Sequence, residues 1–195
     1  MPPMIKVLGI AGSPRRGGNT EFIINEALNA ARQEGAEVEA LRLVEKDIRP
    51  CDGCLTCAKM GKCSIEDDFM EVFEKMAQAD AIIIASPSYF GSVTPQVKAL
   101  IDRAGYYNAN ALGRSAFTGK VGGAIAVARR TGSEAVWTQI LLFILSQRMI
   151  VPGVAGFPNL MAKERGDALK DAEGLEKARE LGRAVASLAA KLKGR

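Results

Sequence analysis

The sequence predicts an α/β fold built on one parallel sheet, because apolar runs of strand length alternate with segments of helical periodicity. Residues 5–11, 81–85 and 121–128 are nearly continuous apolar runs, as expected of strands that are buried on both faces. Each run is followed by a loop rich in Gly, Ser, Pro or Arg and then by a helical pattern. We therefore predict a doubly wound sheet of five parallel strands with helices on both faces.

The first half of the chain continues this alternation. A helix is expected from Thr20 to Gly35, because its apolar residues share one face and glycine favours a helix end. A second strand is expected at residues 38–44. A cysteine-rich loop insertion then occupies about residues 48–66, and an aspartate directly after it caps the next helix.

The second half supplies the remaining elements. Thr94 and Pro95 open a helix, a short strand is expected near residues 149–155, and a charged helix covers about residues 167–192. The helical segment 135–145 is apolar nearly all round, whereas a helix that covers a sheet with one face is amphipathic. The excess of apolar surface on this helix predicts a subunit contact in a homo-oligomer, either a dimer or a tetramer. Deeper burial inside the monomer is the alternative.

Length and composition favour one globular domain over residues 1–195. The 195 residues carry a net charge of +4, and Lys and Arg are spread along the chain rather than gathered as in a nucleic-acid-binding surface. The amino-terminal residues lack the pattern of a signal peptide, and the apolar run 140–145 is too short to span a bilayer. We expect a soluble, cytoplasmic protein that binds neither nucleic acid nor membrane.

The loop after the first strand reads GSPRRGGNT, residues 12–20, and predicts a phosphate site. Free N–H groups at the start of the following helix attract an anion. Side-chain donors are added by Ser13, Arg15, Asn19 and Thr20. Neither G-x-G-x-x-G nor a Walker A motif is present, so this is not a common nucleotide loop. A helix-start turn without a ligand is the alternative.

Two further loops belong at the same end of the predicted sheet. Tyr89 and Phe90 follow the third strand, where aromatic rings can flank a flat heterocycle, and Gly91 and Ser92 add hydrogen-bonding groups. The alternative is that the aromatic rings cover the sheet edge or an oligomer contact. The loop RRTGS, residues 129–133, is cationic and polar, or else a solvated basic turn. Phosphate cradle, aromatic faces and cations together suit a mononucleotide with a flat ring, and flavin mononucleotide (FMN) fits best.

All four cysteines lie within thirteen residues, at Cys51, Cys54, Cys57 and Cys63, in a chain without histidine. Their spacing, C-x2-C-x2-C-x5-C, is closer to a ferredoxin-type cluster loop than to the two separated pairs of a structural zinc site. The spacing therefore favours a [4Fe–4S] cluster. A zinc site with four cysteines, thiol redox chemistry through a Cys-x-x-Cys pair, and four unrelated thiols are the alternatives.

These motifs resemble the NAD(P)H-dependent FMN reductase superfamily, which has a flavodoxin-like fold. The resemblance rests on GSPRRGGNT, on PSYFGSVTPQVKALIDR and on the cysteine segment between them. It implies that the loop after the first strand holds the FMN phosphate and that Pro87 through Ser92 border the ring and ribityl chain. The full set of cofactor-binding residues implied is Ser13, Arg15, Asn19, Thr20, Pro87, Ser88, Tyr89, Phe90, Gly91, Ser92, Arg129, Thr131 and Gly132, the last three by position.

The cysteine motif within this frame resembles the iron–sulfur flavoprotein branch of that superfamily. This resemblance implies electron transfer between a [4Fe–4S] cluster and FMN, with a ferredoxin-like donor, a small-molecule or protein acceptor, and a tetramer that brings cluster and flavin of neighbouring subunits close. One alternative is an NAD(P)H-dependent FMN or quinone reductase whose cysteines bind zinc or are free. Another is a non-enzymatic binding module with a structural zinc and no flavin. No catalytic general base is expected.

Overall fold

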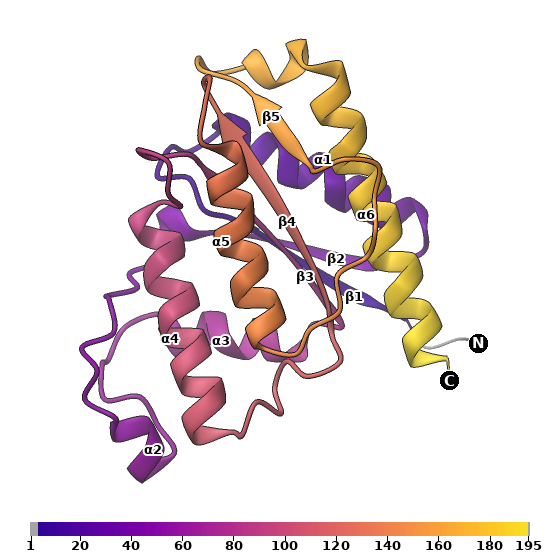
Figure 1. The fold of residues 1–195 in the computed structure, drawn as a ribbon. Coiled ribbons are helices and arrows are strands. Elements are labelled where there is room, and N and C mark those ends of the chain that lie inside the picture. Colours follow the sequence, from indigo (N-terminus) through magenta and orange to yellow (C-terminus); the bar gives the residue numbers. More distant parts are fainter. Residues whose placement is uncertain (1–3, 195) are drawn as a thin grey trace.

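The protein, described over residues 4–194 in a computed structural model, is built around a five-stranded parallel sheet (Figure 1). The strand order is β2-β1-β3-β4-β5, and every neighbouring pair runs parallel, as predicted. The strands are β1 (Lys6–Ala11), β2 (Glu37–Arg42), β3 (Ala81–Pro87), β4 (Val121–Ala128) and β5 (Asn159–Met161).

Helices cover both faces of the sheet (Figure 1). One face carries α1 (Asn19–Gln33) and α6 (Ala172–Lys193), and the other carries α3 (Phe69–Gln78), α4 (Pro95–Ala111) and α5 (Ser133–Ser146). Alternate residues of β3 face the two cores: Ile82 and Ile84 pack with α3, α4 and α5, whereas Ile83 packs with α1 and α6. Burial on both faces explains why β3 has no polar residue before Ser86.

Short helical turns complete the chain. They are a 3-10 turn at Leu43–Glu45, the five-residue helix α2 (Thr56–Met60) within the cysteine segment, and a 3-10 turn at Asp167–Lys170. No helix within residues 4–194 has the length and apolar character that crossing a membrane requires.

The prediction of a strand at residues 149–155 is wrong. Only Ile150 pairs there, through an isolated parallel bridge to Val121, and the fifth strand forms later, at Asn159–Met161. Pro152 has no N–H to donate, so the ladder that begins at Ile150 cannot continue. Pairing resumes beyond Pro158, whose carbonyl accepts from the N–H of Ala126.

The start of the last helix also differs from the sequence prediction. Residues 167–170 form a 3-10 turn, and α6 begins at Ala172, where the Asp171 carboxylate accepts from the N–H of Gly174 at 2.9 Å. A carboxylate at this position satisfies one of the free N–H groups at the helix start. The turn before it therefore belongs to the loop that follows β5.

Close packing brings the loop after β1 against the start of α4. The hydroxyl of Thr94 donates to the Gly12 carbonyl at 2.6 Å, and the Gly12 N–H donates to the Ala85 carbonyl at 2.8 Å. A Cβ at Gly12 would lie 2.0 Å from a methyl carbon of Val97, so only glycine fits here. This contact aligns the ends of β1 and β3 at one edge of the sheet.

Candidate functional site

A cavity of about 300 Å³ opens at the carboxyl ends of the central strands. Three loops meet there, those after β1, β3 and β4, as the topology of a doubly wound sheet requires. Eight of the thirteen predicted cofactor residues line this cavity: Ser13, Arg15, Asn19, Thr20, Pro87, Ser88, Tyr89 and Arg129. The loop after β5 adds Ala162 and Lys163, which the sequence analysis missed, and β4 adds Val127.

The part of the cavity next to α1 is suited to an anion. Ser13 and Thr20 are buried there, and the Ser13 hydroxyl accepts from the N–H of Arg15 at 3.1 Å. Within residues 4–194, no side chain caps α1 at Gly18, so the first N–H groups of the helix stay available to a ligand. Arg15 and Lys163 add two cations to the same wall.

The side chain of Asn19 has a role that the sequence did not reveal. Its amide nitrogen donates to the Glu164 carbonyl at 2.8 Å, and its oxygen accepts from the N–H groups of Gly166 and Ala168. Asn19 thus fastens the loop after β5 to the start of α1. The fastened loop is the one that presents Lys163 to the cavity.

The loop after β3 is a tight turn in which Tyr89 and Ser92 exchange backbone hydrogen bonds. Tyr89 lines the cavity, whereas Phe90 is fully exposed with a positive φ of 50°. The Ser92 hydroxyl donates to the Gln139 side chain on α5 at 2.9 Å. Phe90, Gly91 and Ser92 therefore stand at the rim of the site, outside the described lining.

Gly132 brings the loop after β4 against the loop after β3. Its φ is +87°, and a Cβ there would lie 2.5 Å from the Ser88 hydroxyl oxygen and 3.0 Å from the Gly91 Cα. Thr131 and Gly132 do not line the described cavity, whereas Arg129 does. The predicted third loop thus contributes one cation, Arg129, to the cavity lining, and it approaches the loop after β3 at Gly132.

The residues at the strand ends fit FMN by their chemistry. Free helix N–H groups with Arg15 and Lys163 match a phosphate, and Tyr89 lies on the opposite loop, where an aromatic face can meet a flat ring. Ser13, Thr20 and Ser88 add hydroxyl groups to the lining of the same cavity.

A second cavity gathers all four cysteines. Cys51, Cys54, Cys57 and Cys63 line it together with Arg103, Tyr106 and Tyr107 of α4, and all four thiols are free. Within residues 4–194, no three Cys, Asp or Glu side chains converge closely enough to form a ready metal centre. By donor type, four thiols around one cavity match an iron–sulfur or zinc site.

The thiols in this cavity differ in their surroundings. Hydrogen bonding to the Ser64 hydroxyl, 3.2 Å from the Cys54 sulfur, lowers the pKa of the Cys54 thiol. Burial raises the pKa of the Cys57 thiol. The Cys63 sulfur accepts from the Arg103 guanidinium at 3.2 Å. The loop therefore offers hydrogen-bonded sulfurs rather than four equivalent solvated thiols.

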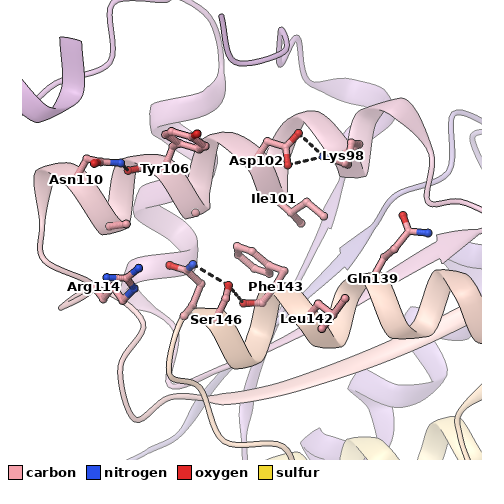
Figure 2. Close-up of a pocket in the computed structure, with 13 residues that line it drawn as sticks. Lys98, Ile101, Asp102, Tyr106, Asn110, Arg114, Gln139, Leu142, Phe143 and Ser146 are labelled. Atoms are coloured by element: carbon pink, nitrogen blue, oxygen red, sulfur yellow. Dashed lines mark hydrogen bonds and ion pairs between the residues drawn. The ribbon is translucent and has the colours of Figure 1, made fainter. Parts of the chain in front are cut away.

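A groove of about 570 Å³ separates α4 from α5 on the outer face of the helical layer. Figure 2 shows Ile101 of α4 and Phe143 of α5 pointing toward one another across it, with the Lys98–Asp102 ion pair on the rim. Tyr106 lines both this groove and the cysteine cavity. At the other end Gln139 accepts from the Ser92 hydroxyl of the loop after β3, so the groove runs from the cysteine cavity toward that loop.

Comparisons with known proteins agree with this architecture. The sequence model described as NADPH-dependent FMN reductase matches residues 5–159. An iron–sulfur flavoprotein from Methanocaldococcus jannaschii is 44% identical over 191 residues, covering 94% of this chain and 97% of the relative. An iron–sulfur flavoprotein from Methanosarcina thermophila is 38% identical, covering 76% of this chain and 78% of the relative.

Solved structures support the fold. A flavodoxin from the domain Archaea superposes with a TM-score of 0.64 at 13% identity, covering 95% of this chain and 99% of that one. A flavone reductase superposes with a TM-score of 0.74 at 23% identity, covering 95% of this chain and 63% of that one. The five-stranded sheet is thus flavodoxin-like, as expected. The chain is an FMN-dependent oxidoreductase that belongs to the NADPH-dependent FMN reductase family, in its iron–sulfur flavoprotein branch.

Proposed function

We propose that the protein transfers electrons between a [4Fe–4S] cluster and FMN, taking them from a ferredoxin-like donor and passing them to a small-molecule or protein acceptor. The observation that carries this proposal is the gathering of all four cysteines around one cavity, in a chain whose strand-end loops form a second cavity with the chemistry of an FMN site. When bound, the cluster supplies one-electron exchange and FMN supplies two-electron storage.

The residues of the strand-end cavity hold and orient FMN in this proposal. The α1 N-terminus, Ser13, Thr20 and Arg15 take the phosphate, and Lys163 adds a second cation. Tyr89 covers the ring, with Pro87 and Ser88 beside the ribityl chain. Arg129 places a cation by the cavity, which stabilises negative charge on a reduced ring.

The cysteine cavity holds the cluster through Cys51, Cys54, Cys57 and Cys63. No histidine exists in the chain, so the four cysteines are its complete set of thiolate and imidazole ligands. Gly53 and Gly61 have positive φ values of 70° and 67°, which permit the tight turns that a compact cluster loop needs.

We also propose that a second copy of the chain docks on the α4–α5 groove. The loop after β1 contacts Thr94 just before α4, whereas Arg103, Tyr106 and Tyr107 of the same helix line the cysteine cavity. At 1.5 Å per residue these points lie about 12–18 Å apart along α4. Tyr106 on α4 and Leu142 and Leu145 on α5 supply exposed apolar surface on the two helices that border the groove. A second copy on this face would approach both sites at once.

An anaerobic preparation tests the cofactor assignment. Iron, sulfide, zinc and flavin are measured in the wild type, in Cys63→Ser and in the loop control Lys62→Ser. We expect four iron and four sulfide per chain in the wild type and in the control, an electron paramagnetic resonance signal after reduction, and loss of iron in Cys63→Ser with FMN retained. Flavin with neither iron nor sulfide in the anaerobic wild type would refute the cluster.

The second candidate is an NAD(P)H-dependent FMN or quinone reductase whose cysteines bind zinc or are free. It is favoured by the match of residues 5–159 to the sequence model described as NADPH-dependent FMN reductase. Stoichiometric zinc, or no metal, together with steady-state NAD(P)H oxidation in the absence of ferredoxin would support it over the first proposal.

A further inference from the structure

Arg103 is a buried cation beneath the cysteine loop. It lies on α4 with only 2% of its surface exposed, and it lines the cavity that holds the four cysteines. One terminal nitrogen donates to the Cys63 sulfur at 3.2 Å and to the Ile65 carbonyl at 3.3 Å. The guanidinium thus contacts both a cysteine of the motif and the backbone that directly follows it.

The other contacts of Arg103 hold it in place. Its second terminal nitrogen donates to the carboxylate of Asp67, which is fully buried, and to the Arg49 carbonyl at 3.2 Å. The guanidinium carbon lies 4.2 Å from the centre of the Phe69 ring. Arg49 and Asp67 stand on either side of the cysteine segment, so one side chain ties both of its ends to α4.

The Nε atom of Arg103 is buried without a hydrogen-bond partner in the described residues. A buried guanidinium normally satisfies its donors, because an unpaired one pays its full desolvation penalty. Here one donor is directed at a sulfur, which is a weaker hydrogen-bond acceptor than oxygen, and another has no partner among the described residues. This arrangement is better matched to a neighbour that carries more negative charge than a thiol does, such as cluster-bound thiolates.

Resting on the cluster assignment above, we propose that Arg103 is a positioning residue that fixes Cys63 for cluster binding and raises the reduction potential of the cluster. Reduction adds one electron from the ferredoxin-like donor, forms and breaks no bond, and increases the negative charge on the sulfurs. An N–H···S hydrogen bond and a nearby positive charge stabilise that added charge.

Two neighbouring substitutions separate this role from simple structural support. Asp67→Asn/Arg103→Gln removes the cation together with its buried counter-charge, so no lone charge is left buried. Asp67→Asn alone keeps Arg103 and its sulfur contact while it removes a negative charge near the site. The proposal therefore predicts opposite directions: a lower cluster potential in the double variant and an unchanged or higher one in Asp67→Asn.

The measurement is a redox titration of anaerobic protein followed by electron paramagnetic resonance, with iron, sulfide and flavin counted in the same samples. We expect the ratio of reduced to oxidised cluster at a fixed potential to be at least tenfold lower in the double variant than in the wild type. For one electron, a tenfold change corresponds to a reduction potential that is lower by about 59 mV. A double variant with full iron and the wild-type potential would overturn the role of Arg103 and leave the cluster assignment standing. Wild type without iron and sulfide would overturn both.

Arg103→Lys decides the matter if the double variant does not fold. Lysine keeps the charge but lacks the planar set of donors that reaches sulfur, carbonyls and carboxylate together. We expect a folded, flavin-containing protein with reduced iron content or a potential below that of the wild type. Full iron content at the wild-type potential would contradict the proposal.

Discussion

Asn19 at the start of α1 holds Glu164, 145 residues later, through a 2.8 Å hydrogen bond from its side-chain amide to the Glu164 carbonyl. Its side-chain oxygen accepts two further N–H groups from the same loop, those of Gly166 and Ala168. Because Lys163 directly precedes this contact and lines the strand-end cavity, Asn19 links the part of that cavity next to α1 to the loop after β5.

Replacing Asn19 by alanine should loosen this loop. Loss of the three hydrogen bonds is expected to lower the free energy of unfolding by about 1–3 kcal/mol and to weaken FMN binding severalfold, since Lys163 is no longer fixed. Flavin titration of apoprotein and urea unfolding measure the two effects. Asn29→Ala is the control, because Asn29 is an exposed residue of α1 that bonds only to Arg32 among the described contacts. Equal FMN affinity in both variants would contradict the role of Asn19.

Arg15 and Arg16 are adjacent arginines with different surroundings. Arg15 lines the cavity, whereas Arg16 points to the surface and pairs with Glu45 at 3.0 Å. Arg15→Ala should weaken FMN binding by about 10–100-fold, the value of one hydrogen bond to a charged group. Riboflavin lacks the phosphate, so its affinity should stay unchanged. Arg16→Ala should alter neither affinity. If Arg15→Ala weakened riboflavin and FMN binding equally, the FMN phosphate would not bind at this end of the cavity.

Alanine substitutions at Gly132 and Gly35 distinguish the effect of backbone strain from the effect of contact between two loops. Both have a positive φ near 88°, so alanine should cost each about 1–2 kcal/mol of stability. Only at Gly132 would the new Cβ meet other atoms, those of Ser88 and Gly91. We expect Gly132→Ala to weaken FMN binding and Gly35→Ala to leave it unchanged, although both variants carry the same backbone strain. Isothermal titration of FMN checks this, and matching affinities would show that the loop contact does not shape the site.

The sequence was sufficient for the central sheet and for most of the strand-end loops. Residues 81–85 read AIIIA, and such a continuous apolar run is typical of a strand that is buried on both faces. The loops that follow parallel strands meet at one edge of the sheet. The fifth strand was misplaced because its three residues carry no periodic signal, while residues 149–155 are apolar until Pro152 stops the pairing.

Long-range polar contacts were beyond sequence reasoning. Arg103 ends the stretch ALIDR, which resembles the solvated edge of an amphipathic helix, and nothing local indicates that it pairs with Asp67 under the cysteine loop. Lys163 and the partners of Asn19 were missed for the same reason, since their contacts cross more than 140 residues. Such contacts depend on tertiary structure rather than on periodicity.

Asp167 makes the stability contributed by the loop after β5 depend on pH. Hydrogen bonds from the Lys170 ammonium and from the N–H groups of Glu164 and Lys163 lower the pKa of the Asp167 carboxyl from 3.8 to about 2. A lowered folded-state pKa contributes stability above pH 4 that disappears as the pH falls toward 2. Asp167→Asn should therefore unfold at lower urea than wild type at pH 5, with the difference shrinking at pH 2–3. A constant difference across this range would contradict the assignment.

Leu142 tests whether a second copy of the chain covers the α4–α5 groove. Its side chain lines this groove from α5 at 62% exposure, whereas Leu169 is 67% exposed on the 3-10 turn after β5. Both leucines are surface residues, so glutamate at either position should leave folding intact. A charge buried in an interface without a partner is costly, so Leu142→Glu should dissociate the oligomer and Leu169→Glu should not.

Sedimentation velocity of the two variants, run beside the wild type at the same concentration, measures this difference directly. If electrons pass between sites on neighbouring copies, Leu142→Glu should also slow flavin reduction by reduced ferredoxin, while its iron and flavin contents stay at the wild-type level. Dissociation with unchanged flavin reduction would place electron transfer within one chain. A Leu142→Glu protein that sediments as the wild type does would move the subunit interface away from this groove.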